Sequence, residues 1–266
     1  MHLPQLGLGT FRLQGQAAID SVRNGLELGY RHIDTAQIYG NEAEVGQALR
    51  DARVARREVF VTTKIWTEHL AAERLAPSLK DSLHKLGVEQ VDLTLIHWPS
   101  PANAVPVAES MAALLAARDA GLTGAIGISN FPPALMREAI DAVGAANIAT
   151  NQVELHPYLQ NRALADAARA AGIHVTAYMP LANGKVIDDA AIRAIARQHD
   201  ATPAQVTLAW LLAKGYAVIP SSTRREHLAG NLAAARLALD AGELAALDAL
   251  DRGERLVNPD FAPAWD

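Results

Sequence analysis

The chain has 266 residues, 50% of them hydrophobic and 20% charged, so it can bury a large core in one or two domains. A net charge of −5 without any basic block argues against a nucleic-acid partner, and the absence of cysteine excludes disulfides, thiolate nucleophiles and cysteine-bound zinc. No charged leader opens the chain and no apolar run reaches about 18 residues, so we expect a soluble cytoplasmic protein with no membrane partner.

Short apolar runs rich in Val, Ile and Thr alternate along the chain with amphipathic segments of helical length. We count eight runs, in chain order: RHIDT near residue 32, EVFVTTK near 60, VDLTLIHW near 94, GAIGISN near 127, IATNQVEL near 152, IHVTAY near 175, YAVIPSS near 218 and ARLAL near 237. This alternation predicts parallel strands joined by crossover helices, and the near-continuous apolarity predicts strands buried on both faces.

Glycines mark where the helices are expected to end before the next strand: Gly87, Gly121, Gly172 and Gly215. No linker divides the chain, so the pattern predicts an α/β fold, a closed (β/α)8 TIM barrel formed by a single domain over residues 1–266. The opening LGLGTF segment suggests a short N-terminal hairpin across the floor of the barrel.

Polar or aromatic residues close the first seven of these runs. They are Asp34, Lys64, His97, Ser129 with Asn130, Gln152, Tyr178, and Ser221 with Ser222. Taken singly, each has a structural explanation, since a lysine at a strand end usually reaches solvent and a histidine there is often a hydrogen-bonded core residue. Barrels carry their chemistry at the carboxyl ends of the strands, so the joint pattern predicts one site at one mouth.

Four residues near the first three strand ends suit the reduction of a carbonyl group: Asp34, Tyr39, Lys64 and His97. A free phenol has a pKa near 10, and a neighbouring ammonium lowers it. Lys64 would supply that ammonium and Asp34 would hold it charged, while a neutral His97 donates to the carbonyl oxygen. Tyr39 would then give its proton to the substrate. None of the four donates a hydride, so a cofactor must supply it.

Several motifs in order resemble the aldo-keto reductases along nearly the whole chain. The matching segments are GYRHIDTAQIYGNEAEVG, TTKIW, LTLIHWP, IGISNF and TNQVELHPYLQ. The resemblance implies a catalytic tetrad of Asp34, Tyr39, Lys64 and His97, with Tyr39 as the acid. Finer matches, such as HPYLQNR and VIPSSTRR, imply small dicarbonyl or keto-sugar-acid substrates such as methylglyoxal and 2,5-diketo-D-gluconate.

No glycine-rich dinucleotide fingerprint follows any strand. The resemblance instead implies that NADPH lies extended across the barrel mouth. It assigns the nicotinamide carboxamide to Ser129, Asn130 and Gln152 and the nicotinamide ring to Tyr178. Leu181 is expected to contact the pyrophosphate through its backbone, with Lys185 as a candidate charge partner.

The segment IPSSTRREHLAGN departs from the family at the adenosine end of the cofactor. Ser221 replaces a common lysine, His227 a common arginine and Gly230 a common glutamate, whereas Asn231 is retained. The segment still begins a helix after a strand, so free N–H groups with the hydroxyls of Ser222 and Thr223 can bind phosphate.

Two arginines restore positive charge beside these hydroxyls. A guanidinium can grip a 2′-phosphate, and we therefore predict that Arg224, or else Arg225, gives a preference for NADPH. Simple solvation of both arginines is the alternative.

Phe11, Trp66 and Trp98 stand where the family has an aromatic substrate pocket, and an apolar wall favours small carbonyl compounds. The C-terminal RGERLVNPDFAPAWD segment is expected to fold over the mouth, with Arg255 and Trp265 as candidate contacts to an acidic sugar. The resemblance favours a monomer whose partner is a small carbonyl substrate.

Two other functions are compatible with parts of this sequence. A metal-dependent barrel hydrolase would use Asp34, His97, Glu154 and His156 as ligands, but the usual H-x-H motif is absent from the first strand and Lys64 is better explained by the phenol, so we expect no metal. A regulatory protein could keep the fold and the cofactor without turnover.

Overall fold

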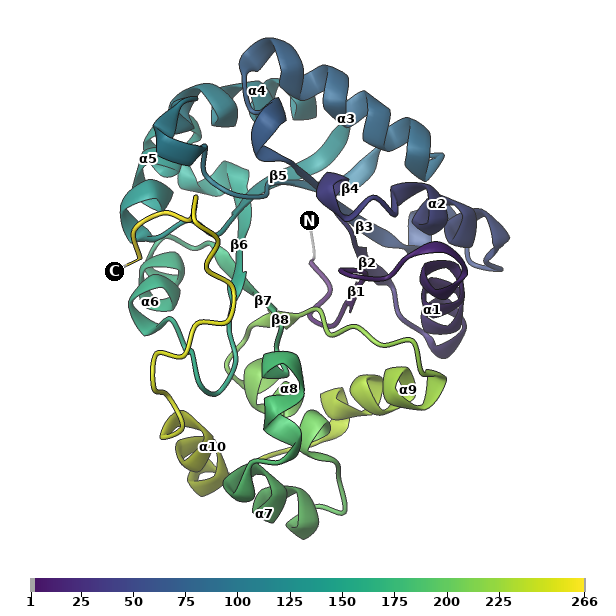
Figure 1. The fold of residues 1–266 in the computed structure, drawn as a ribbon, viewed down its shortest axis with the longest axis vertical. Coiled ribbons are helices and arrows are strands. Elements are labelled where there is room, and N and C mark those ends of the chain that lie inside the picture. The colour runs from purple at the N-terminus through teal and green to yellow at the C-terminus, as the bar shows by residue number, and fades with distance from the viewer. Residues whose placement is uncertain (1–2, 266) are drawn as a thin grey trace.

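The computed structural model describes residues 3–265 and shows a barrel of eight parallel strands inside a ring of helices (Figure 1). The strands are β1 (Leu8–Gly9), β2 (His32–Asp34), β3 (Phe60–Ile65), β4 (Val91–Ile96), β5 (Thr123–Ser129), β6 (Ile148–Glu154), β7 (His174–Tyr178) and β8 (Ala217–Val218). The helices are α1 (Gly15–Leu28), α2 (Glu42–Asp51), α3 (Ala72–Leu86), α4 (Val107–Asp119), α5 (Pro133–Val143), α6 (Arg162–Ala170), α7 (Ala190–Gln198), α8 (Pro203–Ala213), α9 (Arg225–Ala233) and α10 (Ala241–Asp248).

The sheet closes on itself between β1 and β8. The N–H of Gly7 donates to the carbonyl of Val218 at 2.8 Å, and the N–H of Gly9 donates to the carbonyl of Pro220 at 3.1 Å. Glycine is required at position 9 because a Cβ atom there would lie 2.7 Å from the carbonyl oxygen of Ile219. The predicted (β/α)8 barrel is therefore confirmed, with the strands in sequence order around the sheet.

Two details of the sequence prediction are wrong. The LGLGTF segment forms no hairpin within residues 3–265, because Leu8–Gly9 is itself the first barrel strand and pairs in parallel with β2. The ARLAL run is not the eighth strand: it continues from a 3-10 turn at Ala234–Arg236, and Leu237 and Leu239 pack against the core from outside the sheet. A two-residue strand is too short to show any hydrophobic period, whereas a leucine-rich connection imitates one.

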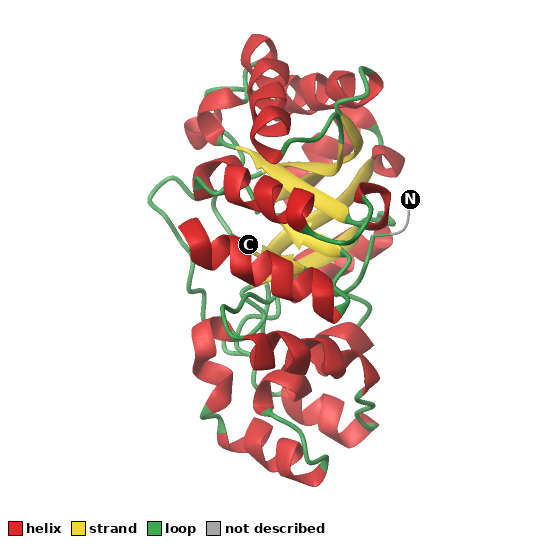
Figure 2. Cartoon of the chain, turned by 90° about the vertical axis from the view of Figure 1, so that its right-hand side faces the viewer, coloured by secondary structure: helices red, strands yellow, loops and turns green. Residues whose placement is uncertain are grey.

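The strands and helices follow from where apolar residues fall. All six residues of β3 are buried, as expected for a strand covered by helices on its outer face, and Figure 2 shows the helices enclosing the strands. The predicted helix-ending glycines have left-handed φ angles: 68° at Gly87, 79° at Gly121, 72° at Gly172 and 81° at Gly215. Such angles strain any residue with a Cβ atom, so glycine stops each helix cleanly.

The parallel register aligns the strand ends. Asp34 is level with Thr62, Lys64 with Leu95, Ser129 with Gln152, and Glu154 with Tyr178. The C-terminal tail then runs back from α10 past β6 and α6, on the face of the barrel where the strands end (Figure 1). Within residues 3–265, every helix is too short or too polar to cross a lipid bilayer.

Candidate active site

Lys64 lies at the centre of the candidate site. It is the second-last residue of the buried strand β3, and its side chain is 0% exposed. Its Nζ donates to Asp34 Oδ1 at 2.5 Å, to the Thr35 carbonyl at 2.9 Å and to the Tyr39 hydroxyl at 3.2 Å. An ammonium has three protons, so these three acceptors satisfy it completely.

The charge of Lys64 is held by Asp34. Burial by itself would lower the pKa of the Lys64 ammonium, but the attraction of Asp34 and Tyr39 outweighs burial and raises that pKa above 10.5. The second carboxylate oxygen of Asp34 accepts a hydrogen bond from Gln152 Nε2 at 2.8 Å. The predicted contact between Lys64 and Asp34 is therefore observed. The hydrogen bond from Gln152 extends this network across the barrel to β6.

Tyr39 differs from the sequence expectation in one respect. Burial raises the pKa of its phenol above 10.0, and the nearby Lys64 ammonium lowers that pKa only in part. The expected net lowering is wrong for the free protein because desolvation penalises the phenolate more than one ammonium stabilises it. Tyr39 is thus protonated at neutral pH. The pull of Lys64 matters once negative charge develops on its oxygen.

His97 follows β4 and is 8% exposed. Burial, with a smaller contribution from the Lys64 charge, holds the pKa of its imidazole well below 6.5, so the ring is neutral as expected. The ring lies 5.6 Å from that of Tyr39 and 5.3 Å from that of Trp66, between centroids. Its Nδ1 atom has no hydrogen-bond partner within residues 3–265. A neutral imidazole is a donor that places no added positive charge beside Lys64.

The residues assigned to the nicotinamide converge at the ends of β5, β6 and β7. Asn130 has a left-handed φ of 63°, and its Nδ2 donates to the carbonyl of His97 at 3.0 Å. Its Oδ1 accepts from the Tyr178 hydroxyl at 2.8 Å, and Ser129 Oγ donates to the carbonyl of Gln152 at 2.8 Å. Ser129, Asn130, Gln152 and Tyr178 are thus brought together beside Asp34, a set of amides and hydroxyls suited to a carboxamide.

The residues assigned to the adenosine end lie in an open segment between β8 and α9. Ser221, Thr223 and Arg224 are exposed, and Ser222 Oγ accepts from the N–H of Arg224 at 3.1 Å. The Ser222 carbonyl accepts from Ser21 Oγ of α1 at 2.7 Å, which ties the segment to the barrel wall.

The two arginines of this segment differ in their hydrogen-bond partners and in how firmly they are held. Arg225 Nη1 donates to Glu27 Oε2 at 2.8 Å and to Asn24 Oδ1 at 2.6 Å, so α1 already holds it. Arg224 has an acidic oxygen only at 3.8 Å, from Glu226, and its side chain is 67% exposed. Asn231, in contrast, is buried within α9.

The loop after β7 partly departs from expectation. Leu181 is half-buried, and its carbonyl accepts from the N–H of Gly184 at 2.9 Å. Lys185 instead forms an ion pair with Glu254 of the C-terminal tail. Its suggested role as a charge partner for pyrophosphate is therefore not supported by this arrangement.

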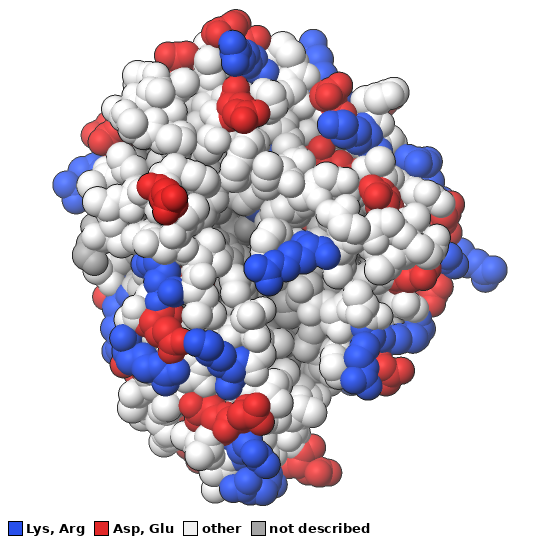
Figure 3. Space-filling model, viewed as in Figure 1, with Lys and Arg blue, Asp and Glu red and all other residues white. Residues whose placement is uncertain are grey.

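Aromatic rings wall the mouth. Phe11 is 45% exposed and lies 5.1 Å from the Tyr39 ring, while Trp66 contacts His97. The tail supplies a further wall, since the ring of Phe261 lies 5.9 Å from Trp66 and 5.7 Å from Trp98, between centroids. The expected tail over the mouth is confirmed by these contacts. The space-filling view shows a central hollow on this face with basic side chains beside it (Figure 3).

Sequence reasoning missed two residues of this wall. Phe261 carries no motif beyond being an aromatic residue in a proline-containing tail. Gln37 lies two positions before Tyr39, and its Oε1 accepts from the N–H of Trp66 at 2.8 Å. Its Nε2 donates to Ser82 Oγ at 3.2 Å, so it braces Trp66 against α3. The loop geometry that brings Gln37 there has no local sequence signal.

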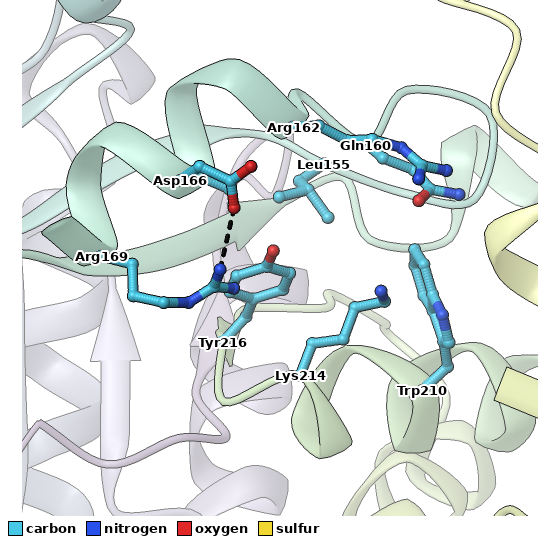
Figure 4. Close-up of a pocket in the computed structure, with 9 residues that line it drawn as sticks. Leu155, Gln160, Arg162, Asp166, Arg169, Trp210, Lys214 and Tyr216 are labelled. Atoms are coloured by element: carbon cyan, nitrogen blue, oxygen red, sulfur yellow. Dashed lines mark hydrogen bonds and ion pairs between the residues drawn. The ribbon is translucent and has the colours of Figure 1, made fainter. Parts of the chain in front are cut away.

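A second hollow, of about 210 Å³, lies between α6 and α8 (Figure 4). Its cations are matched by acids: Arg169 pairs with Asp166 at 2.8 Å, and Lys214 pairs with Asp248 at 2.7 Å. No catalytic candidate lines it. We therefore place the chemistry at the mouth and not in this side hollow.

The residues of the alternative metal site form hydrogen bonds within the protein. Both oxygens of the Glu154 carboxylate accept hydrogen bonds, one from His156 Nε2 at 2.8 Å and others from backbone N–H groups of the tail. Glu154 and His156 therefore bond to each other and to the tail, which leaves the hydrolase interpretation without the ligand set it needs.

Residues 5–252 match the sequence model of the aldo/keto reductase family. The chain is 60% identical over 267 residues to a protein of Salmonella typhimurium named methylglyoxal reductase DkgB, and the match covers 100% of each chain. A crystal structure provisionally named 2,5-diketo-D-gluconic acid reductase B superimposes with a TM-score of 0.96 at 43% identity, covering 99% of this chain and 94% of that one. A variant of Gox0644 in complex with NADPH gives a TM-score of 0.91 at 35% identity over 98% of this chain and 94% of that one.

Proposed function

The chain belongs to the aldo/keto reductase family, and on that premise we propose that it uses NADPH to reduce a carbonyl group of small dicarbonyl compounds or keto sugar acids to an alcohol. The relative named methylglyoxal reductase, with full-length coverage, supports methylglyoxal as a substrate. The similar structure named for 2,5-diketo-D-gluconic acid supports the keto sugar acid.

One observation carries the proposal. Lys64 Nζ donates a hydrogen bond to the Tyr39 oxygen at 3.2 Å, and its other two N–H groups donate to Asp34 Oδ1 and the Thr35 carbonyl. The Tyr39 oxygen is thereby the acceptor in this contact, so its own proton remains available to a substrate. A protonated phenol beside a fixed ammonium is the arrangement that a general acid for an alkoxide needs.

The proposed reaction needs one proton and one hydride. NADPH, when bound, supplies the hydride to the carbonyl carbon. Neutral His97 donates an N–H to the carbonyl oxygen and orients it, and Tyr39 transfers its O–H proton to that oxygen as the C=O double bond is lost. The phenolate that remains on Tyr39 is stabilised by Lys64, whose charge Asp34 supports.

The residues at the mouth fit NADPH at both ends. Asn130 and Gln152 offer amide groups and Ser129 a hydroxyl for the carboxamide, with Tyr178 as a face for the ring. At the other end, the exposed Arg224 lies beside the hydroxyls of Ser222 and Thr223, as a 2′-phosphate requires. We therefore propose that Arg224, and not Arg225, reads the phosphate that distinguishes NADPH from NADH.

The aromatic walls support a small substrate. Phe261 contacts both Trp66 and Trp98 edge-on, and apolar rings around a polar centre exclude water from the reacting carbonyl. Methylglyoxal, which has three carbons, is expected to enter more readily than a bulky aromatic ketone.

The test follows NADPH absorbance with methylglyoxal, 2,5-diketo-D-gluconate, an aromatic aldehyde and a simple sugar. Tyr39→Phe removes the proton and should lower kcat by about 10²- to 10⁴-fold while NADPH binding persists. Tyr30→Phe is the matched control, because Tyr30 is fully buried and donates to the Leu228 carbonyl at 3.0 Å, away from the tetrad. Wild-type protein that binds NADPH but reduces none of the four compounds would instead indicate a regulatory protein.

A further inference from the structure

Glu154 is a buried carboxylate that the proposed reaction does not use. It ends β6 and is 0% exposed. Within residues 3–265 no lysine or arginine lies within salt-bridge distance of it, and three other donors take that place. A carboxylate buried at such a position needs these hydrogen bonds to offset the loss of water.

Two of the three donors belong to the C-terminal tail. The N–H of Leu256 donates to Glu154 Oε1 at 2.7 Å, and the N–H of Val257 donates to Oε2 at 2.8 Å. The third donor, His156 Nε2, also reaches Oε1 at 2.8 Å and so helps fix the carboxylate. One side chain therefore grips two consecutive backbone amides that lie about a hundred positions further along the chain.

Asn161 adds a second tie at the same place. Its Nδ2 donates to the backbone carbonyl of Glu154 at 2.6 Å, and its Oδ1 accepts from Arg255 Nη2 at 3.0 Å. The Arg255 guanidinium stacks over the Trp265 ring at 3.6 Å. The start of the tail is thus attached to the end of β6 by polar contacts on both sides of Leu256.

Beyond Val257 the attachment changes in kind. The hydrogen bonds of residues 258–265 in the described chain stay within the tail, from Ala262 N–H to the Pro259 carbonyl and from Trp265 Nε1 to Asn258 Oδ1. The contacts of this part with the pocket are aromatic, made by Phe261 and Trp265 with Trp66 and Trp98. Such contacts are weaker than hydrogen bonds to a charged carboxylate, so the position of Phe261 depends on where the chain leaves Glu154.

We propose that Glu154 is a positioning residue that fixes the tail as a wall of the substrate pocket and thereby sets the affinity for the carbonyl substrate. This inference rests on the proposed carbonyl reductase function. Glu154 acts through Leu256 and Val257 on Phe261, which closes the space beside Trp98 and Trp66. Glu154 takes no part in the transfer of the proton or the hydride.

Glu154→Gln tests the proposal with little change of shape. Glutamine has one acceptor oxygen, so at least one of the two tail amides loses its partner. Loss of a hydrogen bond to a charged group should raise KM for methylglyoxal by about 10-fold to 100-fold. The kcat at saturating substrate and the affinity for NADPH should not change. Hydrogen exchange of the Leu256 and Val257 amides should accelerate in the variant. An unchanged KM, or a fall in kcat alone, would overturn the proposal.

Deletion of residues 259–266 provides the second variant and leaves Glu154 intact. The deletion should raise KM in the wild type and add nothing further in the Glu154→Gln background, because both changes remove the same wall. If the rises in KM caused by the two changes multiply in the double variant, Glu154 acts by another route and the proposal is wrong. Should Glu154→Gln fail to fold, the deletion and Phe261→Ala must still raise KM without lowering kcat.

Glu243→Gln is the matched control. Glu243 also pairs with a histidine, His199, at 2.7 Å and accepts a backbone N–H, that of Asp240, at 2.8 Å, but it lies on α10. Glu243→Gln should leave KM unchanged. A rise in KM equal to that of Glu154→Gln would contradict a specific role for Glu154. Wild-type turnover is the reference throughout, so failure of the proposed function, seen as an inactive wild type, is distinct from failure of this inference.

Discussion

The two ends of the proposed cofactor site are built in opposite ways. At the nicotinamide end, Asp34, Lys64 and Gln152 are buried, and Lys64 and Gln152 each donate a hydrogen bond to the Asp34 carboxylate. At the adenosine end, Ser221, Thr223 and Arg224 lie in an exposed segment with few partners.

The contrast follows from what each end must do. Proton transfer requires atoms held within a fraction of an ångström, and a dry, interlocked site supplies charge that needs no reorganisation. Recognition of a phosphate needs only net positive charge and free donors, and exposed side chains provide these at little structural cost. Substitutions at the buried end should therefore damage both folding and chemistry, whereas those at the exposed end should alter cofactor choice alone.

The largest expected effect comes from Lys64→Met. The change leaves Asp34 as an uncompensated buried charge, which should lower the free energy of unfolding by about 3–5 kcal/mol, and it removes the group that stabilises the Tyr39 phenolate. Denaturant unfolding and steady-state kinetics measure the two effects. In Lys85→Met, which breaks an exposed pair with Asp81, the loss should stay below about 1 kcal/mol with turnover intact. Equal stability losses in the two variants would show that the buried pair contributes no more to stability than an exposed pair.

A smaller effect is expected from Arg224→Gln. Loss of a charge-assisted bond to the 2′-phosphate should weaken NADPH binding by about 10-fold to 100-fold and leave NADH binding unchanged. Arg225→Gln should have less effect on this ratio because Glu27 and Asn24 already hold that guanidinium. Fluorescence titration with both cofactors measures the ratio, and a larger change in Arg225→Gln would reverse the assignment.

The smallest effect concerns pH. Since burial holds the pKa of His97 well below 6.5, the ring stays neutral and the rate of carbonyl reduction should be nearly flat from about pH 8 down to about pH 6. Since burial raises the pKa of Tyr39 above 10.0, the acid keeps its proton and the alkaline loss of rate should begin only above that value. Single-turnover rates test both limbs. A loss of rate centred near pH 6.5 would show that His97 is solvated and not buried.

The residues that the sequence singled out lie together because a parallel barrel translates position along a strand into position in space. Lys64 and Gln152 lie near the carboxyl ends of β3 and β6, and the barrel brings both side chains to Asp34. The prediction failed where the signal was short or misleading. Leu8–Gly9 is too brief to show a period, and the leucines near 237 pack against the core without forming a strand.

Other features depend on contacts between distant segments. Arg224 and Arg225 are adjacent and chemically identical in the sequence, yet only Arg225 faces Glu27 of α1. The rise in the pKa of Tyr39 reflects how deeply the loop is buried, which local sequence does not record. The tail amides that bind Glu154 belong to residues of no special chemical type.

By itself, then, the sequence determined the fold class, the ends of most strands and the chemical types gathered at the mouth, because hydrophobic period and residue identity are local properties of the chain. The tertiary structure decided which groups keep their protons, which arginine is held by α1 and what fixes the tail. Those properties arise from burial and from pairings between residues far apart in the chain, and both exist only once the barrel has closed.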